Sequence, residues 1–205
     1  INLDSPEIGI THTMGFSGFL GGQYKSNITK VSIYKRQWLG SWGYLDFHAN
    51  AQAQWNKVPF QMLIMPPINL SYFEQEETVS MMKDWEFLND RQVFWALSWD
   101  MNGKLLNRIP LIKKLKWREW LAIKGVYGHL TDKNNPFLEK NKNDDTIFLF
   151  PKGSDVMGNT PYWECVVGVH NIFKFFAVEY VRRLTYINRP GIHKGGVRFN
   201  FMMSF

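Results

Sequence analysis

The sequence predicts an all-β fold, namely an antiparallel transmembrane β-barrel with about eight strands in residues 1–205. Apolar and polar residues alternate through repeated segments, so that 45% of residues are hydrophobic and 16% aromatic although the mean hydropathy is only -0.28. The links between these segments alternate between short and long. No apolar run is long enough for a spanning helix, so any membrane crossing must be made by strands.

Three segments alternate clearly and are predicted strands. Residues 44–55 place Leu45 and Phe47 on one face and Asp46 and His48 on the other. Residues 92–102, with Val93, Trp95, Leu97, Trp99 and Met101 on the apolar face, and residues 162–169, with Trp163, Cys165, Val167 and Val169, repeat the pattern.

Weaker alternation predicts further strands at 7–16, 27–37, 115–128 and 175–186 and a last one at 197–205. Two charged residues, Arg182 and Glu119, fall on apolar faces, which indicates a β-bulge or a different register there. Strands of about ten to fourteen residues suit a tilted crossing of the hydrocarbon core better than a soluble sheet.

The links fall into two classes. Short links are predicted near 38–42, 103–114 and 172–175, and long ones near 17–26, 56–90, 130–160 and 187–195. Outer-membrane barrels sort their loops in this way, short on the periplasmic side and long outside. The pattern leaves open whether 56–90 folds inward as a plug or outward as a binding surface.

The chain ends on VRFNFMMSF, in which apolar residues occupy every odd position. This run resembles the C-terminal signal that the barrel-assembly machinery of bacterial outer membranes reads. The signal residues are Val197, Phe199, Phe201, Met203 and Phe205. In a barrel the last strand pairs with the first, so the chain end would be fixed.

Several stretches, GFSGFLGGQY, YKRQWLGSWGYLDF, RIPLIKKLKWREW, KGVYGHLTDKNNP and NIFKFFAVEYVRRLTYINRPGIHKGGVRF, resemble one family. It is the Bacteroidetes-type outer-membrane family of unknown function that carries an N-terminal carboxypeptidase-like regulatory domain, and the likeness is to its C-terminal barrel region. The resemblance implies a Gram-negative outer-membrane location and a single barrel segment, 1–205, from a longer chain. The full barrel would have about sixteen strands; the start at Ile1 without Met agrees with a cropped chain, whereas a closed eight-stranded barrel is the alternative.

Charged residues on the polar faces predict a network in the barrel lumen. The network residues are Asp46, His48, Asp100, Arg118, Glu164, Glu179, Arg183 and Arg198. Glu164 with Arg183, and Glu179 with Arg198, are the expected cross-strand pairs. Such a network neutralises its own charges and needs no catalytic role.

The sequence offers little chemistry. Asp46 and His48 share a face, as an acid–base pair of a barrel-embedded hydrolase would, but no nucleophile stands out. The five histidines and Cys165 lack metal-ligand spacing, so we expect no metal and no cofactor. The net charge of +6 is scattered among carboxylates without a nucleic-acid motif, which excludes nucleic acid as a partner.

We therefore expect an integral outer-membrane β-barrel protein that is not an enzyme and acts as a pore, an accessory subunit or an assembly or transport factor. Its partners would be outer-membrane lipid and lipopolysaccharide, the barrel-assembly machinery and other outer-membrane subunits. The hydrolase and a soluble β-sheet binding module are the alternatives. The basic stretch at 108–118 would contact anionic headgroups or a periplasmic partner, or be a solvated turn.

Overall fold

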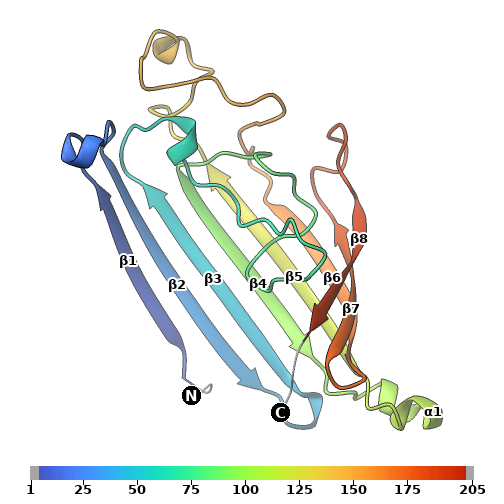
Figure 1. The fold of residues 1–205 in the computed structure, drawn as a ribbon. Coiled ribbons are helices and arrows are strands. Elements are labelled where there is room, and N and C mark those ends of the chain that lie inside the picture. Colours follow the sequence, from blue (N-terminus) through green and yellow to red (C-terminus); the bar gives the residue numbers. More distant parts are fainter. Residues whose placement is uncertain (1–4, 202–205) are drawn as a thin grey trace.

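The computed structural model describes residues 5–201, apart from the side chain of residue 19. These residues form one antiparallel sheet in which eight strands follow each other in chain order (Figure 1). The strands are β1 (Glu7–Gly15), β2 (Ser26–Trp38), β3 (Tyr44–Gln54), β4 (Arg91–Asp100), β5 (Arg118–His129), β6 (Tyr162–Ile172), β7 (Phe176–Arg183) and β8 (Gly195–Phe201). The helical turns are η1 (Phe19–Gly21), η2 (Gly40–Trp42), η3 (Phe60–Met62), η4 (Leu106–Arg108), α1 (Pro110–Lys113) and η5 (Glu139–Asn141).

The period-two reading of the sequence is confirmed for the all-β, antiparallel fold. Each predicted strand overlaps an observed one, and β3 differs from the predicted range of 44–55 by a single residue. The last two strands are shorter than expected, since β7 has 8 residues and β8 has 7. Met203 and Phe205 of the predicted assembly signal lie outside the described residues.

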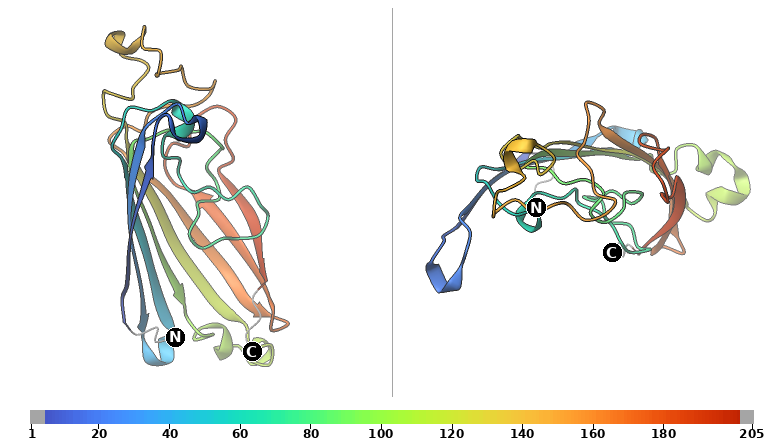
Figure 2. Two further views of the ribbon diagram at one scale, coloured as in Figure 1. Left: turned by 60° about the vertical axis from the view of Figure 1, so that its left-hand side comes forward. Right: turned by 90° about the horizontal axis from the view of Figure 1, so that it is seen from above.

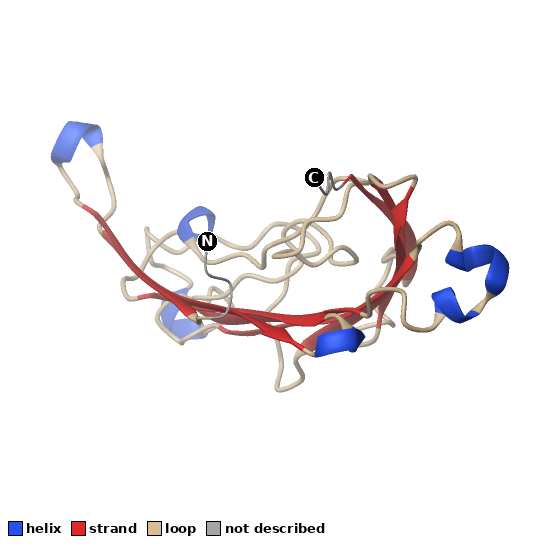
Figure 3. Ribbon diagram, turned by 90° about the horizontal axis from the view of Figure 1, so that it is seen from below, coloured by secondary structure: helices blue, strands red, loops and turns tan. Residues whose placement is uncertain are grey.

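The sheet is curved into an open trough (Figures 2 and 3). Among residues 5–201, β1 forms a ladder only with β2, and β8 forms one only with β7. The expected pairing of the last strand with the first is therefore not seen between the parts of these strands that the structure describes. The edge of β1 presents unpaired backbone groups, which are a template for further strands. On the edge of β8 the β3–β4 link already hydrogen-bonds the backbone of Phe199.

The links sort to the two ends of the sheet as predicted (Figure 1). The β2–β3, β4–β5 and β6–β7 links share one end, and the other connections lie at the opposite end. The β4–β5 link is not a simple short turn, because it carries η4 and α1 and projects away from the sheet. We call residues 103–117 of this link the foot.

The two faces of the sheet differ in character. The convex face carries apolar side chains in the open, such as Ile10, which is 75% exposed, and Val167, which is 56% exposed. The concave face carries the polar and charged residues of the same strands, many of them buried. Since the core does not lie between two sheets, something else must cover the concave face.

The cover is the β3–β4 link, residues 56–90, which folds back into the trough (Figure 3). We call it the inward loop. Val79, Met82 and Phe87 of this loop form one buried cluster with Phe94 and Val126 of the sheet. The loop is irregular, but it supplies the apolar surface that a second sheet supplies in a sandwich.

Arg182 and Glu119 are the two charged residues on the apolar face. Neither requires a bulge or a different register, because both follow the alternation of their strands and lie on the convex face. Arg182 is exposed on the convex face opposite Cys165, and the register shift of β6 and β7 lies elsewhere, between Val169 and Ile172. Glu119 accepts hydrogen bonds from the backbone N–H groups of Leu105, at 2.9 Å, and of Leu106. Its carboxylate therefore holds the foot against the convex side of the sheet.

Candidate functional site

A cluster of buried charged side chains lies between the inward loop and the concave face of β5–β8. Arg183 of β7, with a side chain 0% exposed, meets Glu86 of the loop, 2% exposed. Two parallel hydrogen bonds of 2.6 and 2.9 Å join the guanidinium to the carboxylate. Such a bidentate pair combines energy with a fixed geometry, so it locks the position of the loop.

The Arg183 guanidinium has two further acceptors. It donates to the backbone carbonyl of Met81 in the inward loop at 3.1 Å and to that of Thr185 at 2.9 Å. Its planar group also lies over the ring of Tyr162, with 4.9 Å from its central carbon to the ring centroid. A buried charge is tolerable only when paired and hydrogen-bonded, and Arg183 meets this condition only with the loop in place.

A second buried pair joins Lys124 of β5 to Glu74 of the inward loop. The Lys124 ammonium also donates to the carbonyl of Thr78 at 2.9 Å, and Glu74 accepts a bond of 2.7 Å from the Ser80 hydroxyl. The sheet thus supplies the cation and the loop the carboxylate in both pairs. Neither side can be buried alone without leaving a charge unpaired.

Glu164 of β6 binds backbone N–H groups of the inward loop rather than a charged side chain. Its carboxylate accepts the N–H of Ser80 at 2.9 and 3.0 Å and that of Met81 at 3.1 Å. The Tyr162 hydroxyl donates to the same group at 2.9 Å. The residue is fully buried, so these donors replace its water.

The inward loop also binds the outer edge of β8. The backbone N–H of Phe199 donates to the carbonyl of Tyr72 at 2.8 Å, and the N–H of Glu74 donates to the carbonyl of Phe199 at 2.7 Å. Arg198 of the same strand donates to the carbonyl of Ser80 at 2.9 Å. The inward loop therefore forms polar contacts with all four strands from β5 to β8.

The expected cross-strand neighbours are adjacent, but the expected ion pairs are not formed. Glu164 stands opposite Arg183, and Glu179 stands opposite Arg198. Arg183 nevertheless pairs with Glu86 of the loop, and Glu179 pairs with His170 at 2.7 Å. The prediction failed on partners because it considered only strand residues and left out the carboxylates of the loop.

His170 and Glu179 form a small buried group on the concave face. The His170 ring stacks on Trp120, with centroids 4.6 Å apart and planes at 16°. Nearby, Arg118 lies 3.8 Å from Asp100. Asp100 also accepts the backbone N–H of Asn102 at 2.7 Å, which closes the strand end.

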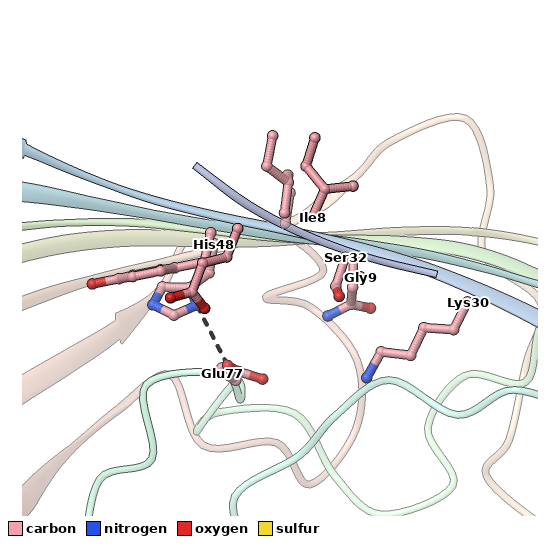
Figure 4. Close-up of a pocket in the computed structure, with 11 residues that line it drawn as sticks. Ile8, Gly9, Lys30, Ser32, His48 and Glu77 are labelled. Carbon is pink, nitrogen blue, oxygen red and sulfur yellow. Dashed lines mark ion pairs between the residues drawn. The ribbon is translucent and has the colours of Figure 1, made fainter. Parts of the chain in front are cut away.

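The trough remains hollow beside β1–β3. A polar cavity of about 310 Å³ is lined there by residues that include Lys30, Ser32, Asn50, His48 and Glu77. Figure 4 shows Ile8 on the opposite side of the sheet from Ser32, Lys30 and His48, which face the loops. His48 Nδ1 lies 3.4 Å from a carboxylate oxygen of Glu77 in the inward loop.

Asp46 and His48 do not form an acid–base pair. Asp46 accepts two hydrogen bonds from Arg36, at 2.7 and 2.6 Å, and one from the Tyr34 hydroxyl at 3.2 Å. His48 packs on the Tyr34 ring instead, with centroids 4.4 Å apart. In the alternative hydrolase the Asp46 carboxylate would have to orient the His48 imidazole. That carboxylate instead pairs with Arg36.

Glu74 and Glu86 are the functional residues that sequence reasoning missed, together with the role of Lys124. The available signal was the acidic stretch EQEE at 74–77 followed by DWEF, set between two strands with polar inner faces. Outside the trough, Lys57 at the start of the inward loop pairs with Asp144 of the β5–β6 link. The hydrogen bond from Lys57 lowers the pKa of the Asp144 carboxyl.

The described part of the chain holds no group of three or more His, Cys, Asp or Glu side chains placed to bind a metal ion. Among residues 5–201 no helix is long and apolar enough to cross a membrane. Comparisons with protein-family models, with curated proteins and with solved structures found no match to this chain.

Proposed function

We propose that this chain is wall and plug of an outer-membrane β-barrel, with the convex face in lipid and the inward loop closing the lumen beside β4–β8. It is not an enzyme, and it serves as an accessory or transport subunit rather than as a permanently open pore. The single observation that carries this proposal is the loop of residues 56–90 fixed to the concave face by buried ion pairs.

The convex face supports the lipid contact. Its exposed apolar residues run across the whole sheet, from Ile8 and Ile10 on β1 to Val197 and Phe201 on β8. A continuous apolar surface of this extent on a soluble protein would promote association. The same alternation, apolar outside and polar inside, is what barrel strands in a membrane require. This argues against the soluble binding module.

The aromatic residues at the strand ends also suit a membrane boundary. Trp38 and Trp42 are exposed at the end of the sheet that carries the β2–β3 turn. Trp55 and Tyr127 are exposed at the opposite end of the sheet. Amphipathic rings prefer the level of the headgroups. Tyr162, which also lies at a strand end, is instead buried under the inward loop.

The open edges support a larger barrel. Eight strands in a closed barrel leave room only for their own side chains, whereas this trough holds a loop of more than thirty residues. Additional strands that pair with β1, and with β8 beside the loop contact at Phe199, would enclose the loop and keep its polar groups away from lipid. The family resemblance to a barrel of about sixteen strands agrees with this arrangement.

The experiment uses the full-length natural protein. Membrane fractionation is followed by heat-modifiability on a gel and by single-channel conductance in a planar bilayer. We expect detergent-requiring, heat-modifiable material in the outer membrane with little or no steady conductance. A large constant conductance would contradict the plug, and a protein that is soluble without detergent would refute the membrane proposal.

A further inference from the structure

The foot, residues 103–117, has a composition that the barrel wall does not explain. It contains five basic residues and no carboxylate. The basic residues are Lys104, Arg108, Lys113, Lys114 and Lys116. Between them lie large apolar side chains that the fold leaves exposed, namely Leu105, Ile109, Leu111 and Leu115, with Leu111 78% exposed.

The foot lies on the convex side of the sheet, at the end of the short links. Seen along the strands, η4 and α1 stand outside the curve of the sheet, on the side away from the inward loop (Figure 3). Glu119, which shares the convex face with Leu121 and Ile123, holds this position by accepting the N–H groups of Leu105 and Leu106. Asn171 at the end of β6 donates to the carbonyl of Lys116 at 2.6 Å.

The position of the foot matters because the apolar convex face continues into it. A residue on the convex side just beyond the strand ends reaches the boundary between acyl chains and headgroups. Apolar side chains bury at that depth, and lysine and arginine extend their charges to the phosphates. The separation of exposed leucines from an all-basic set of charges fits that boundary and fits neither pure hydrocarbon nor bulk water.

We infer that the foot is an interfacial anchor that binds anionic phospholipid headgroups of the leaflet at the short-link end of the barrel. The inference rests on the proposed function, since it requires that the convex face be in lipid. Leu111 and its apolar neighbours enter the upper acyl region, and Lys113 and Lys114 contact the phosphates. The occupant is lipid rather than a protein partner because the apolar surface is continuous with the lipid-facing strands.

The test places one fluorescent label at a time on the full-length protein in bilayers. Cys165→Ala first removes the cysteine of this chain. Leu111→Cys then reports on the foot, and Leu149→Cys is the matched control, because Leu149 is 74% exposed at the opposite end of the sheet. Ile123→Cys on the convex face of β5, probed with lipid that carries its spin label in the acyl chain, is the positive control for lipid contact.

The quenchers are phosphatidylglycerol and phosphatidylcholine that carry a spin label close to the headgroup. We expect the label at position 111 to be quenched by both and more strongly by phosphatidylglycerol, and the label at 149 to be unaffected. The double substitution Lys113→Gln/Lys114→Gln should lower the preference for the anionic lipid, by up to about fivefold for each lysine. Quenching at position 123 should show no such change.

The outcomes separate the inference from the proposal on which it rests. Quenching at 123 without quenching at 111 would overturn the anchor and leave the barrel wall in place, as a foot bound to a periplasmic protein would do. Equal quenching by the two lipids at 111 would overturn the preference for anionic headgroups. Absence of quenching at both positions would refute the membrane proposal itself.

Discussion

Removal of the Glu86 carboxylate should release the inward loop. In Glu86→Ala the guanidinium of Arg183, which is 0% exposed, loses both of its charged hydrogen bonds and keeps only two backbone carbonyls. Breaking a buried pair by removing one partner costs about 3–5 kcal/mol, because the remaining charge is uncompensated. At about 1.4 kcal/mol for each tenfold change, the ratio of docked to released loop should fall by about 100-fold or more.

Hydrogen–deuterium exchange of the protein in lipid measures this ratio directly. The amides of Ser80 and Met81, which donate to Glu164, exchange only when the loop opens. Peptides from 56–90 should therefore exchange at least about 100-fold faster in Glu86→Ala than in the parent, while β5 peptides should not change.

The matched control is Glu139→Ala, which removes an exposed partner of Lys142. An exposed pair contributes about 1 kcal/mol or less, so loop exchange should stay at the parent rate. In the double variant with Arg183→Met the buried charge is gone, and exchange should be slower than in Glu86→Ala alone. Unchanged loop exchange in Glu86→Ala would refute the argument that buried charge fixes the loop.

Three further predictions concern single sites. Lys124→Met, which leaves a buried carboxylate of the inward loop unpaired, should destabilise the loop by about 3 kcal/mol or more in urea titration of the protein in vesicles; an unchanged midpoint would contradict this. Gly125→Ala would place a methyl group in steric overlap with the Trp95 ring, so we expect the indole emission to shift and stability to fall by about 1–3 kcal/mol. Lys57 lowers the pKa of Asp144 from its ordinary 3.8. Their contact should therefore be fully present above pH 3.8 and be lost as the pH falls from 3.8 through the lowered pKa. Limited acid proteolysis of 130–161 would detect the loss.

The alternation of side chains predicted the strands, and the structure shows why it succeeded. In segments such as 44–55 every second side chain meets the same environment, so the period of two is present in the residues themselves. The register placed Glu164 opposite Arg183 for the same reason. A shift by one residue would have moved every apolar side chain of the strand to the polar face.

The inward loop had no such signal. Its backbone is irregular, and its buried residues, such as Val79 and Phe87, follow no period. The partners of Arg183 and Lys124 come from this loop, 97 and 50 residues away in sequence, so strand pairing alone could not identify them. Strand pairing could not identify the partner of Glu119 either, because Glu119 binds backbone amides of the foot and not another side chain.

The separation of the two faces is the central claim, and a cysteine scan along β5 tests it most directly. In the Cys165→Ala protein, labels at Leu121, Ile123 and Tyr127 on the convex face should be quenched by spin-labelled acyl chains. Labels at Ala122 and Val126, which lie buried on the concave face, should be silent, so that quenching alternates with a period of two. Uniform quenching along the strand, or none at any position, would contradict a wall with lipid on one face and the inward loop on the other.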